Sequence, residues 1–597
     1  MSATELDPRV ADRPDDARRD TVSDGSAVAG RHLPKAGAVA LPFVLAAILG
    51  VLQVWGTVGT GYFAGWGDHF VLSPEGLSWA HPGAFENDWF MQVAPQPHWF
   101  FDVLTYLGET AGMLSFVYAA FWAVGLFAFG LATAMLAYRF FADAAWPVAL
   151  GVTMIAAVTP WMIGGTGSGM IAQALPAVLS ANLIYLLLAA MLTERRVLVI
   201  VLAPIIAVVH VQQGSIALVL LASMLLVEIV RIRRIDWFLL GAIGLTGAVV
   251  AFGLTLRPVA SNLSDFVRIC DEVIPYHCAA HLWTRYELAS TVGMIILAAL
   301  SAFVIPRHKR WIWYATVGLA TLGYTGGFLS DALQIPFLGT LAQGVNVYRL
   351  GAVLVPFMVW GAVSPMLVAA RGVRRWILLG AWAIGWVLFL TAPGFPTELR
   401  PRLVLMGLAL LVPVVWFVIS TWRGRQVVRS SGISVLVAGL LVLTFTGVSG
   451  GLTLRTPAFQ FIADPNLRQW GEEVRSVVPE GDVVVASPRY EWVKLVTQRA
   501  VIADCKDVPY GGAAWDEWQD RLKDLGGYKQ CVAPGPLLFD DLTADQLVRV
   551  ADKYDSDFIV VNPVHADTIA GLEDLGWVRV VEPLAGAGAE VLRRPGT

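Results

Sequence analysis

Charged residues are scarce in this sequence. Asp, Glu, Lys and Arg make up only 15% of its 597 residues, whereas an ordinary soluble domain has about 25%. Hydrophobic residues account for 56%, and the mean hydropathy is +0.63. This composition excludes a typical soluble protein and predicts a polytopic membrane protein. The net charge of -4 also lacks the basic excess that nucleic-acid binding needs.

Several common signatures are missing as well. No CxxC or HExxH pattern occurs, which argues against a zinc site, and there is no glycine-rich phosphate-binding loop or internal repeat. The polar tail over residues 1–35 lacks the apolar core of a signal peptide. We expect this tail to be disordered in the cytoplasm, and the first apolar segment to remain as an anchor.

Long apolar segments dominate residues 36–450. A helix needs about 20 apolar residues to cross a bilayer. The hydropathy pattern predicts about thirteen spans, at 37–57, 113–137, 144–163, 172–192, 197–209, 214–230, 236–256, 289–305, 311–328, 347–367, 375–392, 402–420 and 432–449. The short 197–209 segment and its neighbour could instead form one re-entrant hairpin.

Basic residues mark every second connection between these spans. They are Arg139; Arg195 and Arg196; Arg231, Arg233 and Arg234; Arg307, Lys309 and Arg310; Arg371, Arg374 and Arg375; and Arg423, Arg425 and Arg429. Cytoplasmic loops carry an excess of Lys and Arg, and the tail contributes Arg31 and Lys35. The alternation therefore predicts a cytoplasmic N-terminus, and places loop 58–112 and all residues beyond 450 outside.

The composition changes after residue 450. The segments at 482–487 and 557–562 have the pattern of buried parallel strands. Those at 465–478, 513–526 and 543–554 have the spacing of amphipathic helices. We therefore expect an extracytoplasmic α/β domain over residues 451–597, after a transmembrane domain over 36–450.

All four cysteines fall on the predicted outer side. They are Cys270, Cys278, Cys505 and Cys531. Disulfides persist in oxidising compartments, and four cysteines allow three pairings. The local pairs, Cys270 with Cys278 and Cys505 with Cys531, are the most economical.

The loop at 58–112 contains no Lys or Arg but is rich in acidic and aromatic residues. Asp68 follows GWG close to the end of the first span, where a carboxylate can act as a general base or bind a metal. Asp88, in ENDWF, is a second candidate, although it can equally begin a short helix as its N-cap.

Polar residues at other predicted outer span ends could line the same cavity. His210 and Gln212 lie in HVQQG, where a helix breaks. His277 and His281 are four residues apart in IPYHCAAHLW, and Arg349 is the only basic residue of its loop. An arginine suits phosphate through paired hydrogen bonds. Alternatively, each residue simply caps, snorkels or lies on the surface.

The stretch at 505–522 is dense in Trp, Asp and Gly. Such a surface suits carbohydrate. The simpler interpretation packs Trp515 and Trp518 inside an α/β core.

Together these features resemble the GT-C superfamily of membrane glycosyltransferases, and more narrowly a branch of uncharacterised bacterial multi-span proteins near it. The resemblance covers most of the chain. It rests on the acidic first loop with ENDWF, on IPYHCAAHLW, on NVYRL before a late span, and on CKDVPYGGAAWDEW. It matches a Pro-His-His-type stretch only in part, because the two histidines are separated here.

The resemblance implies a glycosyltransferase of the bacterial plasma membrane, with an α-helical polytopic fold and a C-terminal extracytoplasmic α/β domain. The donor would be a polyprenyl-phosphate sugar and the acceptor a glycan or lipid, sometimes with Mg²⁺ or Mn²⁺ taking part. Asp68 would be the base, with Asp88 next, and Arg349 would hold the donor phosphate. The implied substrate-binding residues are His69, Asn87, His210, Gln212, His277, His281, Tyr348 and Arg349.

Two alternatives remain open. A transporter or flippase would show internal repeats and charges within spans, and these spans are nearly free of charge away from their ends. A non-catalytic envelope-assembly protein of the same fold is compatible with the interrupted histidine motif.

Overall fold

The computed structural model describes residues 35–58, 62–93, 98–160, 162–167, 170, 172–256, 263–369, 372–373, 375–377, 379–380, 383–384, 436–445, 452–454, 458–532 and 538–597. The predicted tail up to residue 34 and the predicted span at 402–420 lie outside these residues. The predicted spans at 375–392 and 432–449 fall outside them in part.

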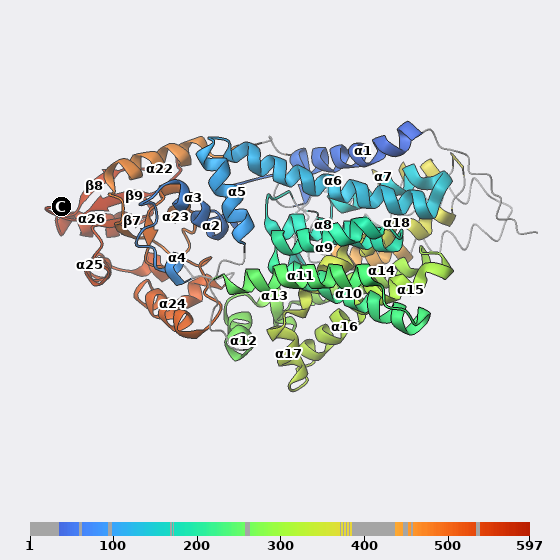
Figure 1. Cartoon of the computed structure of the whole chain (residues 1–597). Helices are drawn as coiled ribbons and strands as arrows, with labels where there is room; N and C mark the ends of the chain where they lie inside the picture. Colours follow the sequence, from blue (N-terminus) through green and yellow to red (C-terminus); the bar gives the residue numbers. More distant parts are fainter. Residues whose placement is uncertain are drawn as a thin grey trace, which may run out of the picture.

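A bundle of apolar helices forms one half of the molecule (Figure 1). Its main members are α1 (Lys35–Trp55), α6 (Leu114–Phe141), α7 (Ala145–Ala157), α8 (Pro176–Leu192), α9 (Arg196–Val209), α10 (Val211–Ile232), α11 (Trp237–Thr255), α14 (Arg285–Leu300), α15 (Arg310–Trp313), α16 (Leu319–Ala332), α17 (Leu338–Gly344) and α18 (Gly351–Ala369). All of them except α17, which lies between two predicted spans, overlap the predicted apolar segments. Helix α8 is buried along almost its whole length.

Small residues let neighbouring helices of the bundle approach closely. At Gly130 of α6, an added Cβ would lie 2.3 Å from the carbonyl oxygen of Pro42 in α1. At Gly361 of α18, it would lie 1.8 Å from the carbonyl oxygen of Leu297 in α14. Close backbone packing of this kind is common between membrane helices, because apolar lipid offers no hydrophobic drive for their association.

By length and composition, four helical segments among the described residues could cross a membrane, or five if the bent pair Leu338–Gly344 and Val347–Val363 counts as one. The four are Leu114–Ala157, Val211–Ile232, Trp237–Thr255 and Arg285–Phe303. Four more apolar helices of 10–17 residues accompany them. The protein is therefore a multi-pass, mostly helical membrane protein, and the count of thirteen spans stays a prediction.

The first loop folds into short helices between the bundle and the C-terminal unit (Figure 1). They are α2 (His69–Leu72), α3 (Pro74–Ala80), α4 (Trp89–Val93) and α5 (Trp99–Thr110). Strand β1 (Gly56–Val58) leads into this loop and pairs with β4 (Leu452–Leu454), which precedes the C-terminal unit. The end of the first helix and the start of the C-terminal unit are thus joined directly.

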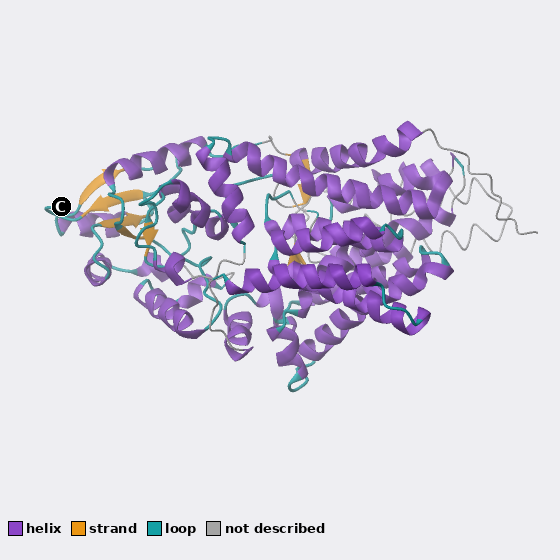
Figure 2. Ribbon diagram, viewed as in Figure 1, coloured by secondary structure: helices purple, strands orange, loops and turns teal. Residues whose placement is uncertain are grey.

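Residues 458–532 and 538–597 form an α/β unit, and its strands gather at one end of the molecule (Figure 2). The sheet order is β6-β5-β7-β9-β8. The strands are β5 (Val483–Val485), β6 (Ala500–Val501), β7 (Phe558–Val561), β8 (Val578–Val581) and β9 (Glu590–Arg593), and the helices are α22 (Pro465–Val477), α23 (Trp492–Thr497), α24 (Gly512–Asp524), α25 (Ala544–Lys553) and α26 (Ala566–Asp574). The segments predicted as parallel strands are β5 and β7, and they do pair in parallel.

Alternate residues of these strands point into two separate cores. Val484 and Phe558 pack with Trp470 on one face of the sheet. Val485 and Ile559 pack with the stacked pair Trp515 and Trp518 on the other face. The Trp-rich stretch therefore builds an α/β core, as its simpler interpretation has it.

The segment that holds α12 (Leu263–Glu272) and α13 (Pro275–Cys278) docks onto the C-terminal unit. Ile269 and Val273 belong to the core that contains Trp515, and the Asp265 carboxylate accepts a hydrogen bond from the Gly512 N–H at 2.9 Å. Both local cysteine pairs are bonded, Cys270 with Cys278 in this segment and Cys505 with Cys531 in the C-terminal unit.

Candidate functional site

Asp68 lies at the junction of the first loop and the C-terminal unit. Its position follows a turn in which Gly65 has φ +71°, and an added Cβ there would lie 2.5 Å from the backbone nitrogen of Ile462. Only glycine fits such a close approach in the left-handed region. The Asp68 carboxylate accepts a hydrogen bond from the Lys506 ammonium at 3.0 Å and remains 57% exposed.

The charges around Asp68 favour its ionised form. Desolvation by the surrounding protein raises the pKa of Asp68, but the charge and hydrogen bond of Lys506 outweigh it and lower this pKa below its ordinary value. Within the described part of the chain, no hydrogen bond reaches its second carboxylate oxygen. Asp68 is therefore ionised at neutral pH and has one oxygen available to accept a proton.

Lys506 reaches Asp68 from a tight turn in the C-terminal unit. Its backbone N–H donates to the Asp504 carboxylate at 2.8 Å, and its neighbour Cys505 is disulfide-bonded to Cys531. Burial opposes the charge on Lys506, but the nearby carboxylates of Asp68 and then Glu491 raise its pKa above the ordinary value. The lysine is a fixed cation beside the candidate base.

His277 and Tyr276 come to the same place from α13. Burial, and then the Arg349 guanidinium, lower the pKa of His277 to about 4. The ring is thus neutral at neutral pH, and the contact of its Nδ1 with the carbonyl oxygen of Gly165 at 3.2 Å makes Nδ1 the donor. The other ring nitrogen is then a hydrogen-bond acceptor.

Arg349 approaches from the bundle, in the short helix η6 (Val347–Leu350) at the head of α18. Its guanidinium interacts electrostatically with Asp68, Tyr276 and Tyr510. Its Nε is buried and makes no hydrogen bond with the described residues. We call these six residues the Asp68 cluster: Asp68, Tyr276, His277, Arg349, Lys506 and Tyr510.

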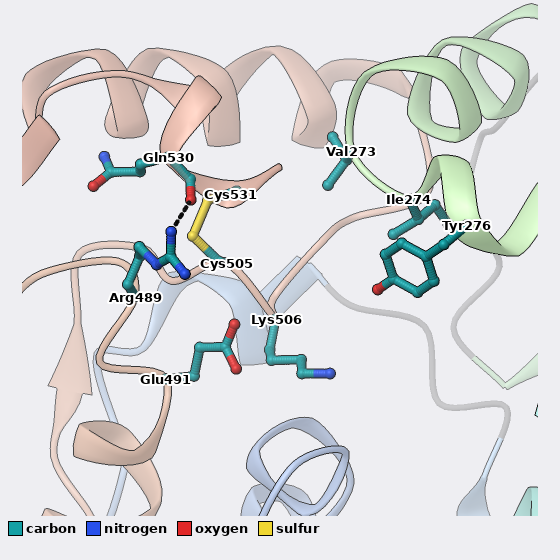
Figure 3. A pocket seen from close by; sticks show the side chains of 9 residues that line it. All are labelled: Val273, Ile274, Tyr276, Arg489, Glu491, Cys505, Lys506, Gln530 and Cys531. Atoms are coloured by element: carbon teal, nitrogen blue, oxygen red, sulfur yellow. Dashed lines mark hydrogen bonds between the residues drawn. A yellow bond between two sulfur atoms is a disulfide. The ribbon is translucent and has the colours of Figure 1, made fainter. Parts of the chain in front are cut away.

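A small cavity adjoins this cluster on the side of the C-terminal unit (Figure 3). Its volume is about 120 Å³, and it is lined by Val273, Ile274, Tyr276, Arg489, Glu491, Cys505, Lys506, Gln530 and Cys531. Burial, opposed by Lys506, raises the pKa of Glu491 to about 7. Lys506 and Tyr276 belong to both the cavity and the Asp68 cluster.

Asp88, the second acidic candidate of the loop, lies apart from the cluster. Its side chain is 1% exposed and caps α4, because it accepts the Met91 N–H at 3.1 Å. Its other oxygen accepts the Val501 N–H at 3.4 Å. The N-cap interpretation of Asp88 matches this geometry.

Asp88 also belongs to a buried ion cluster around Lys494. The Lys494 ammonium lies 4.0 Å from Asp88 and 3.8 Å from Asp504, and it is hydrogen-bonded to Asp507. All four side chains are almost fully buried. The pKa values of Asp504 and Asp507 are raised, mainly by burial. The cluster fastens the first loop to the turn that carries Lys506.

The remaining loop candidates have structural partners. His69 is 0% exposed, its Nδ1 lies 3.1 Å from the Ser73 hydroxyl, and its ring packs against Tyr118. The exposed Asn87 donates to the carbonyl oxygen of Gly481 at 2.5 Å. Neither side chain belongs to the Asp68 cluster. Burial lowers the pKa of His69 to about 4, so its ring is neutral at neutral pH.

The other predicted site residues also have contacts that hold them apart from the Asp68 cluster. His281 Nδ1 lies 2.8 Å from the buried Asp331, whose other oxygen accepts the Tyr348 hydroxyl at 2.6 Å. His210 caps α10 through the Gln213 N–H and meets His98 edge to face at 4.6 Å. Gln212 is exposed. The charge of Arg349 acts on both His210 and His98. These two histidines therefore lie at the edge of the Asp68 cluster.

Sequence reasoning missed Tyr276, Glu491, Lys506 and Tyr510 as site residues. A signal was available for three of them, because CKDVPY contains Lys506 and Tyr510 and IPYHCAAHLW contains Tyr276. Glu491 carries no motif, and only the fold brings it to Lys506.

The residues around Asp68 do not fit a divalent metal ion. Such ions prefer several oxygen ligands, whereas the neighbours here are a lysine, an arginine, tyrosines and a histidine. Among the described residues, no three His, Cys, Asp or Glu side chains come together as a metal site requires.

Comparisons with known proteins extend from a short family match to whole-chain structural likeness. A family model described as Domain of unknown function (DUF6798) matches residues 466–525, and no curated protein matches the chain. ArnT from Cupriavidus metallidurans in the apo state is 14% identical, with 94% of this chain and 98% of that chain covered and a TM-score of 0.45. ArnT from the same organism bound to undecaprenyl phosphate is 15% identical, with 95% of this chain and 99% of that chain covered and a TM-score of 0.43.

Arabinosyltransferase EmbB from Mycobacterium smegmatis is 14% identical over 70% of this chain and 42% of that chain, with a TM-score of 0.34. ArnT and EmbB are thus the solved structures to which the course of the chain is similar. At these identities and TM-scores, no residue role is transferred from them.

Proposed function

We propose that this protein is a membrane glycosyltransferase that moves a sugar from a polyprenyl-phosphate donor to an envelope glycan or lipid outside the cytoplasm. The observation that carries the proposal is the Asp68 cluster. Three separate parts of the chain bring an ionised carboxylate, a lysine and an arginine together beside the apolar bundle. The donor class comes from the resemblance of the sequence to GT-C enzymes.

In the proposed reaction, Asp68 accepts the proton of an acceptor hydroxyl. The hydroxyl oxygen then forms a bond to the anomeric carbon as the bond from that carbon to the phosphate oxygen breaks. The lipid phosphate leaves with the electron pair and carries the negative charge. Lys506 keeps the pKa of Asp68 below its ordinary value, so the carboxylate is ionised and can take this role.

Arg349 and Lys506 would stabilise the charge that develops on the departing phosphate. Arg349 lies at the head of a bundle helix. Its buried Nε has no hydrogen-bond partner among the described residues. An arginine binds phosphate oxygens through directed N–H groups. A donor whose lipid chain lies along the bundle would place its phosphate near Arg349. Preorganised donors of this kind commonly supply the largest part of a rate enhancement.

The experiment measures sugar transfer from labelled polyprenyl-phosphate sugars in proteoliposomes. Asp68→Asn should lower the rate by about 100- to 10,000-fold, the usual contribution of a general base. Arg349→Met should lower it by about 100- to 1,000-fold, as expected for a lost charge stabiliser. Glu86→Gln, an exposed acid of the same loop, is the matched control and should transfer at the wild-type rate.

Two outcomes would contradict the proposal. One is a well-folded wild-type protein that transfers no sugar from any donor tested. The other is an Asp68→Asn variant with full activity beside an inactive, folded Asp88→Asn variant, because it would move the base to the buried ion cluster.

A further inference from the structure

The cavity beside the Asp68 cluster lies between two parts of the protein that the disulfides hold. Figure 3 shows Arg489 and Glu491 on one side and Tyr276 and Ile274 on the other, with the Cys505–Cys531 disulfide and Lys506 between them. One wall comes from the C-terminal unit and the other from the α12–α13 segment. With a volume of about 120 Å³, the cavity has room for one small ring and not for a lipid chain.

The lining combines polar groups of both signs with apolar surface. Arg489 donates to the carbonyl oxygen of Gln530 at 3.4 Å and places a guanidinium in the lining. The Glu491 carboxyl makes no hydrogen bond with described residues and faces the cavity. Tyr276 offers a ring face and Ile274 an aliphatic wall.

This set of groups matches a sugar ring. Vicinal hydroxyls both donate and accept hydrogen bonds, so they pair with a carboxyl and a guanidinium at once. The C–H faces of the ring pack on aromatic and aliphatic carbon. Convergent polar groups that fix the orientation of a ligand are typical of small-molecule sites, and here they share the lining with the apolar Val273 and Ile274.

The cavity is continuous with the proposed catalytic centre. Lys506 lines it and also donates to Asp68 at 3.0 Å. A ring held in the cavity would therefore lie one lysine side chain away from the Asp68 carboxylate. Arg349, which would hold the donor phosphate, comes from the head of a bundle helix and does not line the cavity.

We infer that this cavity is the acceptor subsite and that it binds the terminal pentose or hexose ring of the acceptor, with Arg489 and Glu491 holding vicinal hydroxyls. The inference rests on the proposed glycosyl transfer and names the part of the site that selects the acceptor.

The test uses the purified full chain in detergent without any donor. Binding of methyl pentosides and methyl hexosides is measured by saturation-transfer difference NMR. At least one glycoside should bind with a millimolar Kd. Arg489→Met and Glu491→Leu should each weaken this binding by about tenfold or more.

Two further variants keep the test independent of folding. Ile274→Trp fills the cavity without changing any charge and should also abolish binding. Arg549→Met changes an exposed arginine of α25 and should have no effect. The melting temperature of each variant establishes that it is folded.

The outcomes separate the two proposals. The cavity assignment is overturned if no glycoside binds, or if the folded Arg489→Met and Ile274→Trp variants bind like the wild type. The proposed function alone is overturned if glycosides bind in the cavity but the wild type transfers no sugar in the proteoliposome assay.

Discussion

Two acidic side chains of one loop have opposite environments. Asp68 is 57% exposed and paired with one lysine, whereas Asp88 is 1% exposed and caps a helix. An exposed carboxylate in contact with a cation can exchange protons with a substrate, and a buried one that holds backbone N–H groups is committed to the fold. The groups around each carboxylate thus leave Asp68 open to a substrate and commit Asp88 to the fold.

The first prediction concerns the pH dependence of transfer. Lys506 lowers the pKa of Asp68, so Lys506→Met should raise it. Since the base works only when ionised, the acid limb of the rate profile should move to higher pH in this variant. Lys506→Arg keeps the charge and should restore the limb to near its wild-type place. Transfer rates measured across the acidic range test this, and an unmoved limb in Lys506→Met speaks against Asp68 as the base.

The second prediction concerns Glu491, whose pKa is raised to about 7 mainly by burial. The charges facing it are Lys506, Asp504, Asp68 and Arg489, and the phenol of Tyr276 lies in the same cavity. An ionised carboxylate accepts more hydrogen bonds from sugar hydroxyls than a protonated one. Glycoside affinity should therefore rise with pH through a midpoint near 7.

The control for this effect is Glu491→Gln. Its amide has no charge to gain, so NMR titrations at a series of pH values should give a nearly constant affinity. A midpoint near neutral pH that persists in Glu491→Gln would assign the titration to another group.

At the scale of elements, short pieces of the first loop are fastened to the C-terminal unit. The Asp88 side chain holds the start of α4, the backbone of β6 and the Lys494 ammonium together. Strands β1 and β4 pair next to the end of α1 and so join the first loop to the C-terminal unit as well. These connections set the place of Asp68 relative to Lys506, which comes from the C-terminal unit.

The third prediction is that Asp88→Ala destabilises the protein. Loss of a helix cap costs about 1 kcal/mol, and removal of one partner of a buried ion cluster costs about 3–5 kcal/mol. Asp88→Asn keeps an oxygen for the cap and should cost less. Thermal unfolding in detergent measures both, with Glu86→Ala as the exposed control. Equal melting temperatures for Asp88→Ala and the wild type would remove Asp88 from the structural role.

The fourth prediction concerns the Cys505–Cys531 disulfide, which holds the turn beside Lys506. A disulfide across a loop of this size contributes about 3 kcal/mol. The Cys505→Ser and Cys531→Ser double variant should be digested faster within residues 505–531 and should transfer sugar more slowly. The Cys270→Ser and Cys278→Ser pair should instead loosen the α12–α13 segment. Unchanged transfer in the first double variant would mean that Lys506 keeps its place without the bond.

At the scale of the whole molecule, an apolar bundle carries an α/β unit at one end, and the candidate site lies where they meet (Figure 1). The bundle contributes Arg349, the first loop Asp68, and the C-terminal unit Lys506. The proposed function requires a lipid-linked donor and a glycan or lipid acceptor to meet, and this junction is the place where both would reach Asp68.

The fifth prediction is that the C-terminal unit lies outside the cytoplasm. Val564 is 77% exposed in this unit, and Ile235 is 49% exposed beside the basic residues Arg233 and Arg234. A membrane-impermeant thiol reagent should label Val564→Cys in intact cells and Ile235→Cys only after lysis. Labelling of both residues, or of Ile235→Cys alone, would reverse or refute the predicted orientation.

The sequence alone determined the features that depend on local composition. Apolar segments predicted the bundle helices, alternating residues predicted β5 and β7, and the spacing of the cysteines favoured the pairs that are bonded. Each of these follows from residues near one another in the chain, because burial and periodicity are read within a few turns.

Only the tertiary structure decided the membership of the site. Asp68 and Asp88 have similar local sequence signals, yet contacts with Lys506 and Lys494, both from the distant C-terminal unit, separate their roles. Glu491 became a candidate because the fold brings it beside Lys506, where burial raises its pKa. Burial and charge at a site come from segments hundreds of residues apart, and no local pattern of the chain encodes which of them meet.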